Sequence, residues 1–323
     1  MLRDLRVKIR NRHSRISACQ TQEFLPLSKQ FFAFVEANPI LESVISELVA
    51  RNPQSVQEVG TAPRGSQIYG ETAEQAAAIA YTKWKAYAAQ EKMQEFYNHV
   101  HTSDGFEAGL DKYRDWYVEP LFDYLDEVLE DANVILLTLI RYKHKVEWYR
   151  REELQKLFEA NSSQGEKVLA KNMYEYLFDQ GIPFHVEPQT ASGRPDVVSL
   201  EDSDHPFIGD YKVFDAAGRG ATYIKKGLYQ VHQYCCDYNE SVGYLIVFNV
   251  SNKQLRLELP SSGDGVPCFE YGHKTVFITV VDIHAHEVSA SCRGIPETVT
   301  ISADELIREM KEQEQKQSVE ASE

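Results

Sequence analysis

The sequence predicts a helical N-terminal half followed by an α/β C-terminal half. In the first half, apolar residues recur at the three- and four-residue spacing of amphipathic helices, as they do along residues 39–51. From residue 165 to residue 250 the pattern changes to a helix, three short strands, a second helix and an apolar strand. The 323 residues are enough for two domains. We therefore expect a helical domain at 1–160, an α/β domain at 161–303, and a short helix with a disordered acidic tail at 304–323.

Five or six helices are expected in the N-terminal half. The clearest start is at Asn38 and Pro39, since asparagine is a good N-cap and proline suits the first helical position. Residues 1–22 are basic and polar, and we expect a loosely held arm there. A long helical pattern from Pro120 to Phe158 changes from acidic to apolar to basic, and is expected to break near Ala132.

Aromatic residues of this half allow two interpretations, a surface on which bases stack or the core of a helix bundle. The residues concerned are Trp84, Trp116, Tyr117 and Trp148. Aromatic side chains on helices more often fill a core, and we favour that interpretation. The helical half is then a recognition or assembly module, which would bind a partner protein or a second copy of the chain.

Composition argues against a membrane protein. No apolar run approaches the ~20 residues that a membrane-spanning helix needs. Five cysteines without a C-x-x-C motif indicate reduced thiols and a cytoplasmic location. The net charge of −15 weighs against nucleic-acid binding, because phosphate contacts need lysine and arginine. Basic residues are nevertheless concentrated in 1–15 and in 210–230, so a locally basic site is compatible with an acidic protein.

The stretch from Gly193 to Lys212 carries the strongest chemical signal. It is expected to form two strands, with Asp196 at the start of the first and Asp210 near the end of the second. Lys212 follows Asp210 by two residues, which places both side chains on one face of a strand. Two carboxylates can hold Mg²⁺ or Mn²⁺ through oxygen, and an ammonium can orient water or stabilise charge on phosphate. The alternative is that Asp196 caps a turn while the other two form a solvated edge.

Three short motifs on this succession of elements resemble the PD-(D/E)XK nuclease superfamily, in its RecB-like branch. They are Gly193-x-x-Asp196, Asp210-Tyr211-Lys212 and Gln230-x-x-x-Tyr234. The resemblance covers about residues 164–285 and does not extend to the first half. It implies a restriction-endonuclease-like αβββαβ core with a mixed central sheet, and metal-dependent hydrolysis of phosphodiester bonds. DNA as the substrate, and a setting in prokaryotic restriction or antiphage defence, are implied by the resemblance alone.

The resemblance also implies roles for individual residues. The metal ligands would be Asp196, Asp210, the backbone carbonyl of Tyr211 and an acidic residue on the preceding helix. Glu166 is the better candidate on that helix, because it lies within about 70° of the centre of the apolar face. A glutamate in a first turn is equally explained by the helix dipole. Lys212 would activate the water, and Gln230 and Tyr234 would set the geometry of substrate or lysine.

Basic residues after the second strand are candidates for contacting the phosphodiester backbone. These are Arg219, in a loop containing glycine, and Lys225 and Lys226 in the following helix. As an alternative, the two lysines would be an exposed, solubilising pair. A different class of function also stays open, namely a non-catalytic scaffold that keeps the fold for binding while its helical half contacts other proteins. The acidic net charge favours this alternative, and the acid-acid-lysine set argues against it.

Overall fold

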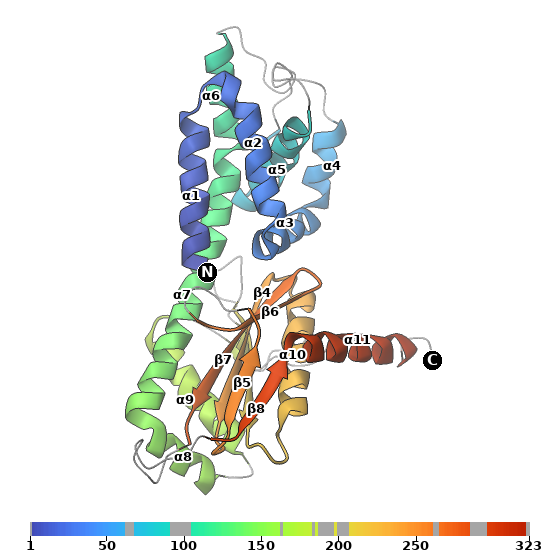
Figure 1. Ribbon diagram of the computed structural model, residues 1–323. Coiled ribbons are helices and arrows are strands. Elements are labelled where there is room, and N and C mark those ends of the chain that lie inside the picture. The colour runs from blue at the N-terminus through green and yellow to red at the C-terminus, as the bar shows by residue number, and fades with distance from the viewer. Residues whose placement is uncertain are drawn as a thin grey trace. The chain divides into compact units, whose positions relative to one another are not determined.

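The computed structural model describes residues 2–61, 68–90, 105–161, 164–182, 185–186, 197–198, 207–260, 265–284 and 296–320 (Figure 1). Two compact units are present, Met1–Asp131 and Ala132–Glu323. The division lies inside one helix, α7 (Glu119–Lys145), and not near residue 160 as expected. The second part of α7 belongs with the sheet of the second unit, since Tyr244 Oη donates to the carbonyl of Ala132 at 3.0 Å.

The first unit is helical, as expected. Its helices are α1 (Leu2–Ala18), α2 (Thr21–Glu36), α3 (Pro39–Arg51), α4 (Pro53–Thr61), α5 (Ala73–Ala88), α6 (Phe106–Tyr117) and the start of α7. The predicted start of α3 is confirmed, because the Asn38 side chain accepts a hydrogen bond from Leu41 N at 3.2 Å and Pro39 is the first helical residue.

Residues 2–18 form a helix, so the expectation of a loosely held arm is wrong. Leu2, Leu5, Ile9 and Ile16 recur at helical spacing along α1 and are buried. The basic residues on the other side are paired: Asp126 of α7 accepts hydrogen bonds from Arg6 at 2.7 and 2.9 Å and from Arg10 at 2.9 and 2.7 Å. The basic composition of this segment therefore reflects contacts within the unit as well as solubility.

Asp126→Asn should destabilise the first unit by about 1 kcal/mol at pH 7, since solvent and salt screen this partly exposed ion pair. Hydrogen bonds from Arg6 and then Arg10 hold the pKa of Asp126 well below its usual range. In the unfolded chain the carboxylate of Asp126 takes up a proton near pH 3.9, whereas in the folded chain it stays ionised at that pH. The difference between wild type and variant is therefore present above that pH and shrinks on acidification. Urea denaturation at several pH values between 7 and 3 measures it, and a difference independent of pH would contradict the assignment.

The core of the first unit is rich in aromatic side chains. Trp84 is fully buried, stacks on Phe31 at 4.8 Å between ring centroids, and donates its indole N–H to Ser28 Oγ at 2.8 Å. Tyr117 is fully buried as well. The core interpretation of these two aromatics is thus confirmed. It is wrong for Trp148, which is 78% exposed.

The second unit contains a mixed sheet of six strands in the order β1-β2-β3-β4-β7-β6. The strands are β1 (His185–Val186), β2 (Val197–Val198), β3 (Ile208–Phe214), β4 (Val242–Asn249), β6 (Cys268–Tyr271) and β7 (Lys274–Asp282). β3, β4 and β7 are parallel, while β1, β2 and β6 are antiparallel to their neighbours. A separate parallel pair is formed by β5 (Gln254–Glu258) and β8 (Thr298–Ser302). Among the described helices, none combines the length and apolar character needed to cross a membrane.

Helices α9 (Gly165–Asp179) and α10 (Ala221–Asp237) lie on opposite faces of β3. Tyr211 contacts Tyr174 of α9 at 6.0 Å between ring centroids, whereas the stem of Lys212 lies beside Gly227 of α10. Successive residues of a strand point to opposite faces, so the two helices cover different faces. The expected order α-β-β-β-α-β is present, and α10 is the crossover between the parallel strands β3 and β4 (Figure 1).

Two further helical segments differ from expectation. The break after α7 lies at Val146–Arg150, which forms a π-helical turn before α8 (Arg151–Ala160), and not near Ala132. The C-terminal helix α11 (Ala303–Glu320) is longer than the short helix expected, and Leu306 and Met310 belong to the same core cluster as α10. The segment is therefore part of the second unit.

Candidate functional site

The candidate site lies where β3 passes under the first half of α10. Ile208, Asp210, Lys212 and Phe214 alternate along β3 and share one face, as the spacing predicted. Ile208 and Phe214 join the apolar core beneath α10. Asp210 and Lys212 are consequently two charged groups held between two apolar residues of the same strand.

Asp210 and Lys212 form a buried ion pair. Lys212 Nζ donates to Asp210 Oδ2 at 2.7 Å. The side chain of Lys212 is 12% exposed and that of Asp210 is 3% exposed. The other carboxylate oxygen, Asp210 Oδ1, accepts the backbone N–H of Tyr211 at 2.8 Å. Burial of a charge is costly unless it is paired and hydrogen-bonded, and here both conditions hold. The pair is not the solvated strand edge of the alternative interpretation.

Gly227 makes the space in which the lysine stem lies. A Cβ atom at this position would be 2.7 Å from Cγ and 2.9 Å from Cε of Lys212. Real Cβ atoms do not approach other atoms so closely, so any larger residue would have to displace the stem. Gly227 is a buried residue in the middle of α10, where glycine is unfavourable for the helix itself. Its presence is explained by the passage of Lys212.

Glu166 lies at the end of the same strand and is held from two sides. Its Oε1 accepts the backbone N–H of Val213 at 2.8 Å, and both of its oxygens are 3.0 Å from the hydroxyl of Tyr223 in the first turn of α10. The ring of Tyr223 is 5.8 Å from Lys212 Nζ. Burial, and then the negative charge of Glu166, raise the pKa of Tyr223 well above its usual range, so the hydroxyl stays a donor. Tyr223 thus connects Glu166 to the ion pair.

The loop before α10 places Arg219 near these groups. Asp215 Oδ1 accepts the backbone N–H groups of Ala217 at 2.9 Å and Arg219 at 2.8 Å, which closes the loop. The charge of Arg219 lowers the pKa of Tyr223, against the larger effects of burial and Glu166. Lys225 is half-buried and Lys226 is exposed. Of the three residues predicted to contact the phosphodiester backbone, Arg219 is the one whose charge acts on Tyr223.

The predicted ligand Asp196 lies outside the described residues. Its sequence neighbour Val197 pairs with Gly209, the residue before Asp210, in the antiparallel β2–β3 ladder. The strand that directly follows Asp196 in the sequence is therefore adjacent to the strand that contains Asp210.

Gln230 and Tyr234 lie further along α10 than Gly227, the residue that meets the stem of Lys212. Gln230 is exposed, and within the described part of the chain it forms no hydrogen bond to Asp210 or Lys212. Tyr234 belongs to the apolar core beneath α10, seven residues beyond Gly227 and thus about 10 Å further along the helix. The hypothesis that both side chains set the geometry of the substrate or the lysine therefore stays a prediction.

Sequence reasoning missed Tyr223 and Gly227, the residues of α10 that do face Lys212. A signal was available, because residues 223, 227 and 234 follow helical spacing and share one face of α10. A glycine inside that face marks a close approach by another part of the chain. The spacing of residues along α10 does not indicate which residue of the neighbouring strand approaches this glycine.

The chemistry of the donors fits a hard divalent cation. Asp210 and Glu166 are carboxylates, and each oxygen of Asp210 accepts one hydrogen bond, so lone pairs remain. In the part of the chain that the structure describes, no group of three or more histidine, cysteine, aspartate or glutamate side chains is close enough to share a metal ion. Asp196 is outside that part, so the expected set of three carboxylates includes one residue not described.

Tyr223→Phe should lower the free energy of unfolding of the second unit by about 1.5 kcal/mol, the lower end for a hydrogen bond to a charged acceptor. Phenylalanine keeps the ring near Lys212 and removes only the donor to Glu166. Tyr238→Phe is the matched control at the end of the same helix, because the Tyr238 hydroxyl forms no hydrogen bond within the described residues. Urea denaturation of both variants measures the effect, and equal stabilities would show that the Glu166 contact contributes nothing.

The chain matches no protein-family model, and neither a curated protein nor a solved structure matches it. A function for this chain is therefore supported by its residues and their geometry alone.

Proposed function

We propose that the second unit is a metal-dependent nuclease of the PD-(D/E)XK type that hydrolyses phosphodiester bonds, with DNA as the favoured substrate. The observation that carries the proposal is the buried Asp210–Lys212 pair at 2.7 Å, on a strand next to the one that follows Asp196. An aspartate and a lysine inside an apolar core need a reason to be retained, because well-packed apolar residues are often at least as stable there. A site that handles a cation and a phosphate supplies that reason.

Asp196, Asp210, the Tyr211 carbonyl and Glu166 are the residues that would hold Mg²⁺ or Mn²⁺. The bound ion supplies Lewis-acid stabilisation of the charge on the phosphate. Lys212 orients the attacking water and stabilises the negative charge that develops in the transition state. The oxygen of the water forms the new bond to phosphorus and releases a proton to solvent, the ester bond breaks, and the leaving oxygen takes up a proton from solvent.

Residues around this centre would bind the substrate. Arg219, whose charge acts on Tyr223, would contact a phosphate of the substrate backbone, with Lys225 and Lys226 further along α10. Gln230 is exposed one turn after Gly227, where it would contact the substrate from the solvent side. Tyr234 would support the strand from the core.

A non-catalytic scaffold is the second candidate. Two observations favour it: the net charge of −15, and the fact that Lys212 and Asp210 already satisfy each other. In that case the pair is a structural ion pair, and the helical unit provides the surface for protein contacts or for self-association.

Cleavage assays with the full chain decide between the two candidates. Supercoiled and linear duplex DNA, single-stranded DNA and RNA are incubated with Mg²⁺, Mn²⁺ or EDTA. The nuclease proposal expects cleavage that needs the metal and is lost in Asp210→Asn. No cleavage of any substrate with either metal, from protein whose circular dichroism shows a folded chain, would overturn the nuclease in favour of the scaffold.

A further inference from the structure

Two adjacent aromatic side chains stand exposed at the π-helical turn between α7 and α8. Trp148 is 78% exposed and Tyr149 is 84% exposed. Single exposed aromatics are ordinary, but two large neighbouring rings left in water forgo substantial stabilisation. A π-helical turn interrupts the regular helix and is frequent at functional sites. The fold does not use these rings for packing.

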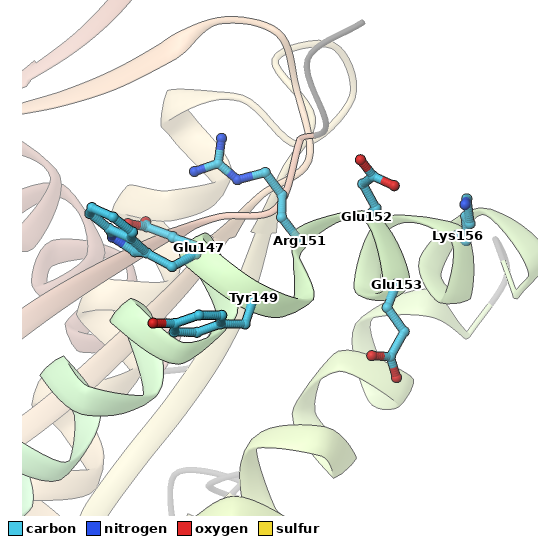
Figure 2. A pocket seen from close by; sticks show the side chains of 7 residues that line it. Glu147, Tyr149, Arg151, Glu152, Glu153 and Lys156 are labelled. Carbon is cyan, nitrogen blue, oxygen red and sulfur yellow. The ribbon is translucent and has the colours of Figure 1, made fainter.

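The same turn lines an open pocket of about 920 Å³. Glu147, Trp148, Tyr149, Arg151, Glu152, Glu153 and Lys156 surround it (Figure 2). Figure 2 shows Tyr149 extending from the turn, Arg151 from the start of α8, and Lys156 from further along α8. The pocket therefore combines exposed rings with cationic groups.

Most of the charged side chains around this pocket that are not engaged in ion pairs are positive. Glu147 accepts Lys143 Nζ at 2.5 Å, and Glu153 accepts Arg150 Nη2 at 2.5 Å, so both carboxylates are neutralised. Within the described residues, Arg151 and Lys156 form no ion pair. Two available cations thus face one further carboxylate, that of Glu152. Aromatic rings beside available cations suit a ligand that has both flat rings and negative charge.

The turn is anchored at the end of the sheet where β3 ends and where Glu166 accepts the backbone N–H of Val213. Glu147 Oε1 also accepts the backbone N–H of Asp282, the last residue of β7, at 2.8 Å. Phe214, Asn249 and Asp282 are partners in register across β3, β4 and β7. Neighbouring strands are about 4.8 Å apart, so the anchor of the turn is about 10 Å from the end of β3. A nucleic-acid strand covers a distance of this size with a few nucleotides.

We propose that Trp148 and Tyr149 form a stacking platform for the unpaired bases of single-stranded nucleic acid, with Arg151 and Lys156 contacting its phosphates. The platform rests on the proposed nuclease function and narrows its substrate to strands with unpaired bases. Bases inside a duplex are stacked on each other and cannot lie on the rings. Stacking is tolerant of sequence, so the platform selects strandedness and not a base order.

Binding to oligonucleotides in EDTA tests the platform without cleavage. The probes are a short oligothymidylate, an oligouridylate and a duplex of the same length, followed by fluorescence anisotropy. Trp148→Ala and Tyr149→Ala should each weaken single-strand binding on the order of tenfold and leave duplex binding unchanged. Phe178→Ala is the matched control, because Phe178 is 71% exposed in the same unit but does not line the pocket.

Tryptophan fluorescence gives a second, independent measurement. Single strands should quench wild-type emission, because a base would stack on exposed Trp148. Trp148→Phe should keep the affinity and lose the quenching, since phenylalanine still stacks. Unchanged affinity in Trp148→Ala, equal binding of duplex and single strands, or failure of wild type to bind single strands would overturn the platform. If wild type cleaves but Trp148→Ala binds single strands as well as wild type does, the platform is refuted and the nuclease proposal stands. If single strands bind and quench the fluorescence but no substrate is cleaved, the nuclease proposal is refuted and the platform stands.

Discussion

Replacing Lys212 with methionine is expected to lower the rate of cleavage by on the order of 100-fold or more. Methionine keeps an unbranched side chain that fits beside Gly227 and removes the ammonium that contacts Asp210 Oδ2. One preorganised group that stabilises transition-state charge is worth about this factor. Initial rates at saturating DNA and Mg²⁺ measure the loss. Lys85→Met, which removes a lysine paired with Glu36 in the first unit, is the control and should cleave at the wild-type rate.

Stability measurements separate a catalytic lysine from a structural one. Lys212→Met alone leaves the carboxylate of Asp210 buried without its partner, and should cost several kcal/mol, as removal of one partner from a buried pair typically does. Asp210→Asn combined with Lys212→Met removes both charges and should recover much of that stability. The proposal expects the double variant to be folded and inactive. Cleavage by the folded double variant within tenfold of wild type would refute the role of the pair.

Gly227→Ala is expected to lower cleavage by about tenfold or more although it adds only one methyl group. An alanine inside a helix is normally about 1 kcal/mol more favourable than a glycine. Here the new Cβ would meet Lys212 Cγ at 2.7 Å, so the flexible lysine stem must move. Because the strain is relieved by that movement, the free energy of unfolding should change by less than about 2 kcal/mol. The ammonium should be displaced from Asp210 Oδ2, and the rate should fall.

Gly218→Ala is the matched control for this substitution. Gly218 lies in the loop before α10, has no atom within 4 Å of an added Cβ, and does not have a left-handed backbone. Its variant should retain both stability and rate. Kinetics on the two variants in parallel compare the same chemical change with and without contact to Lys212. A wild-type rate in Gly227→Ala would mean that the position of the lysine stem is unimportant for cleavage.

The elements of the fold could largely be predicted because their signals are local. The start of α3 depends on Asn38 and Pro39, which act within one turn of the helix. The shared face of Asp210 and Lys212 follows from the two-residue period of a strand. The order of elements from α9 to β4 follows from the succession of periodicities and turn residues. These properties are decided by neighbours in the sequence, so the sequence is sufficient for them.

The predictions that proved wrong concern features that depend on contacts between residues far apart in the sequence. Segment 2–18 was predicted to be a loosely held arm because it is rich in arginine. Two of these arginines pair with Asp126, which is more than a hundred residues away in the sequence. Trp148 looked like a core residue because aromatic residues usually are. A π-helical turn, anchored through Glu147 to the end of β7, leaves it exposed.

By itself, the sequence determined the two-part organisation, the succession of helices and strands in the second unit, and the pairing of an aspartate and a lysine on one strand face. Only the tertiary structure decided that Tyr223 and Gly227 of α10 lie next to the lysine of that pair. The rotation and height of α10 above β3 are set by the crossover to β4 and by packing across the sheet, which involve residues far apart in the chain. Periodicity places residues on a common helix face, but packing selects the residue that contacts the lysine.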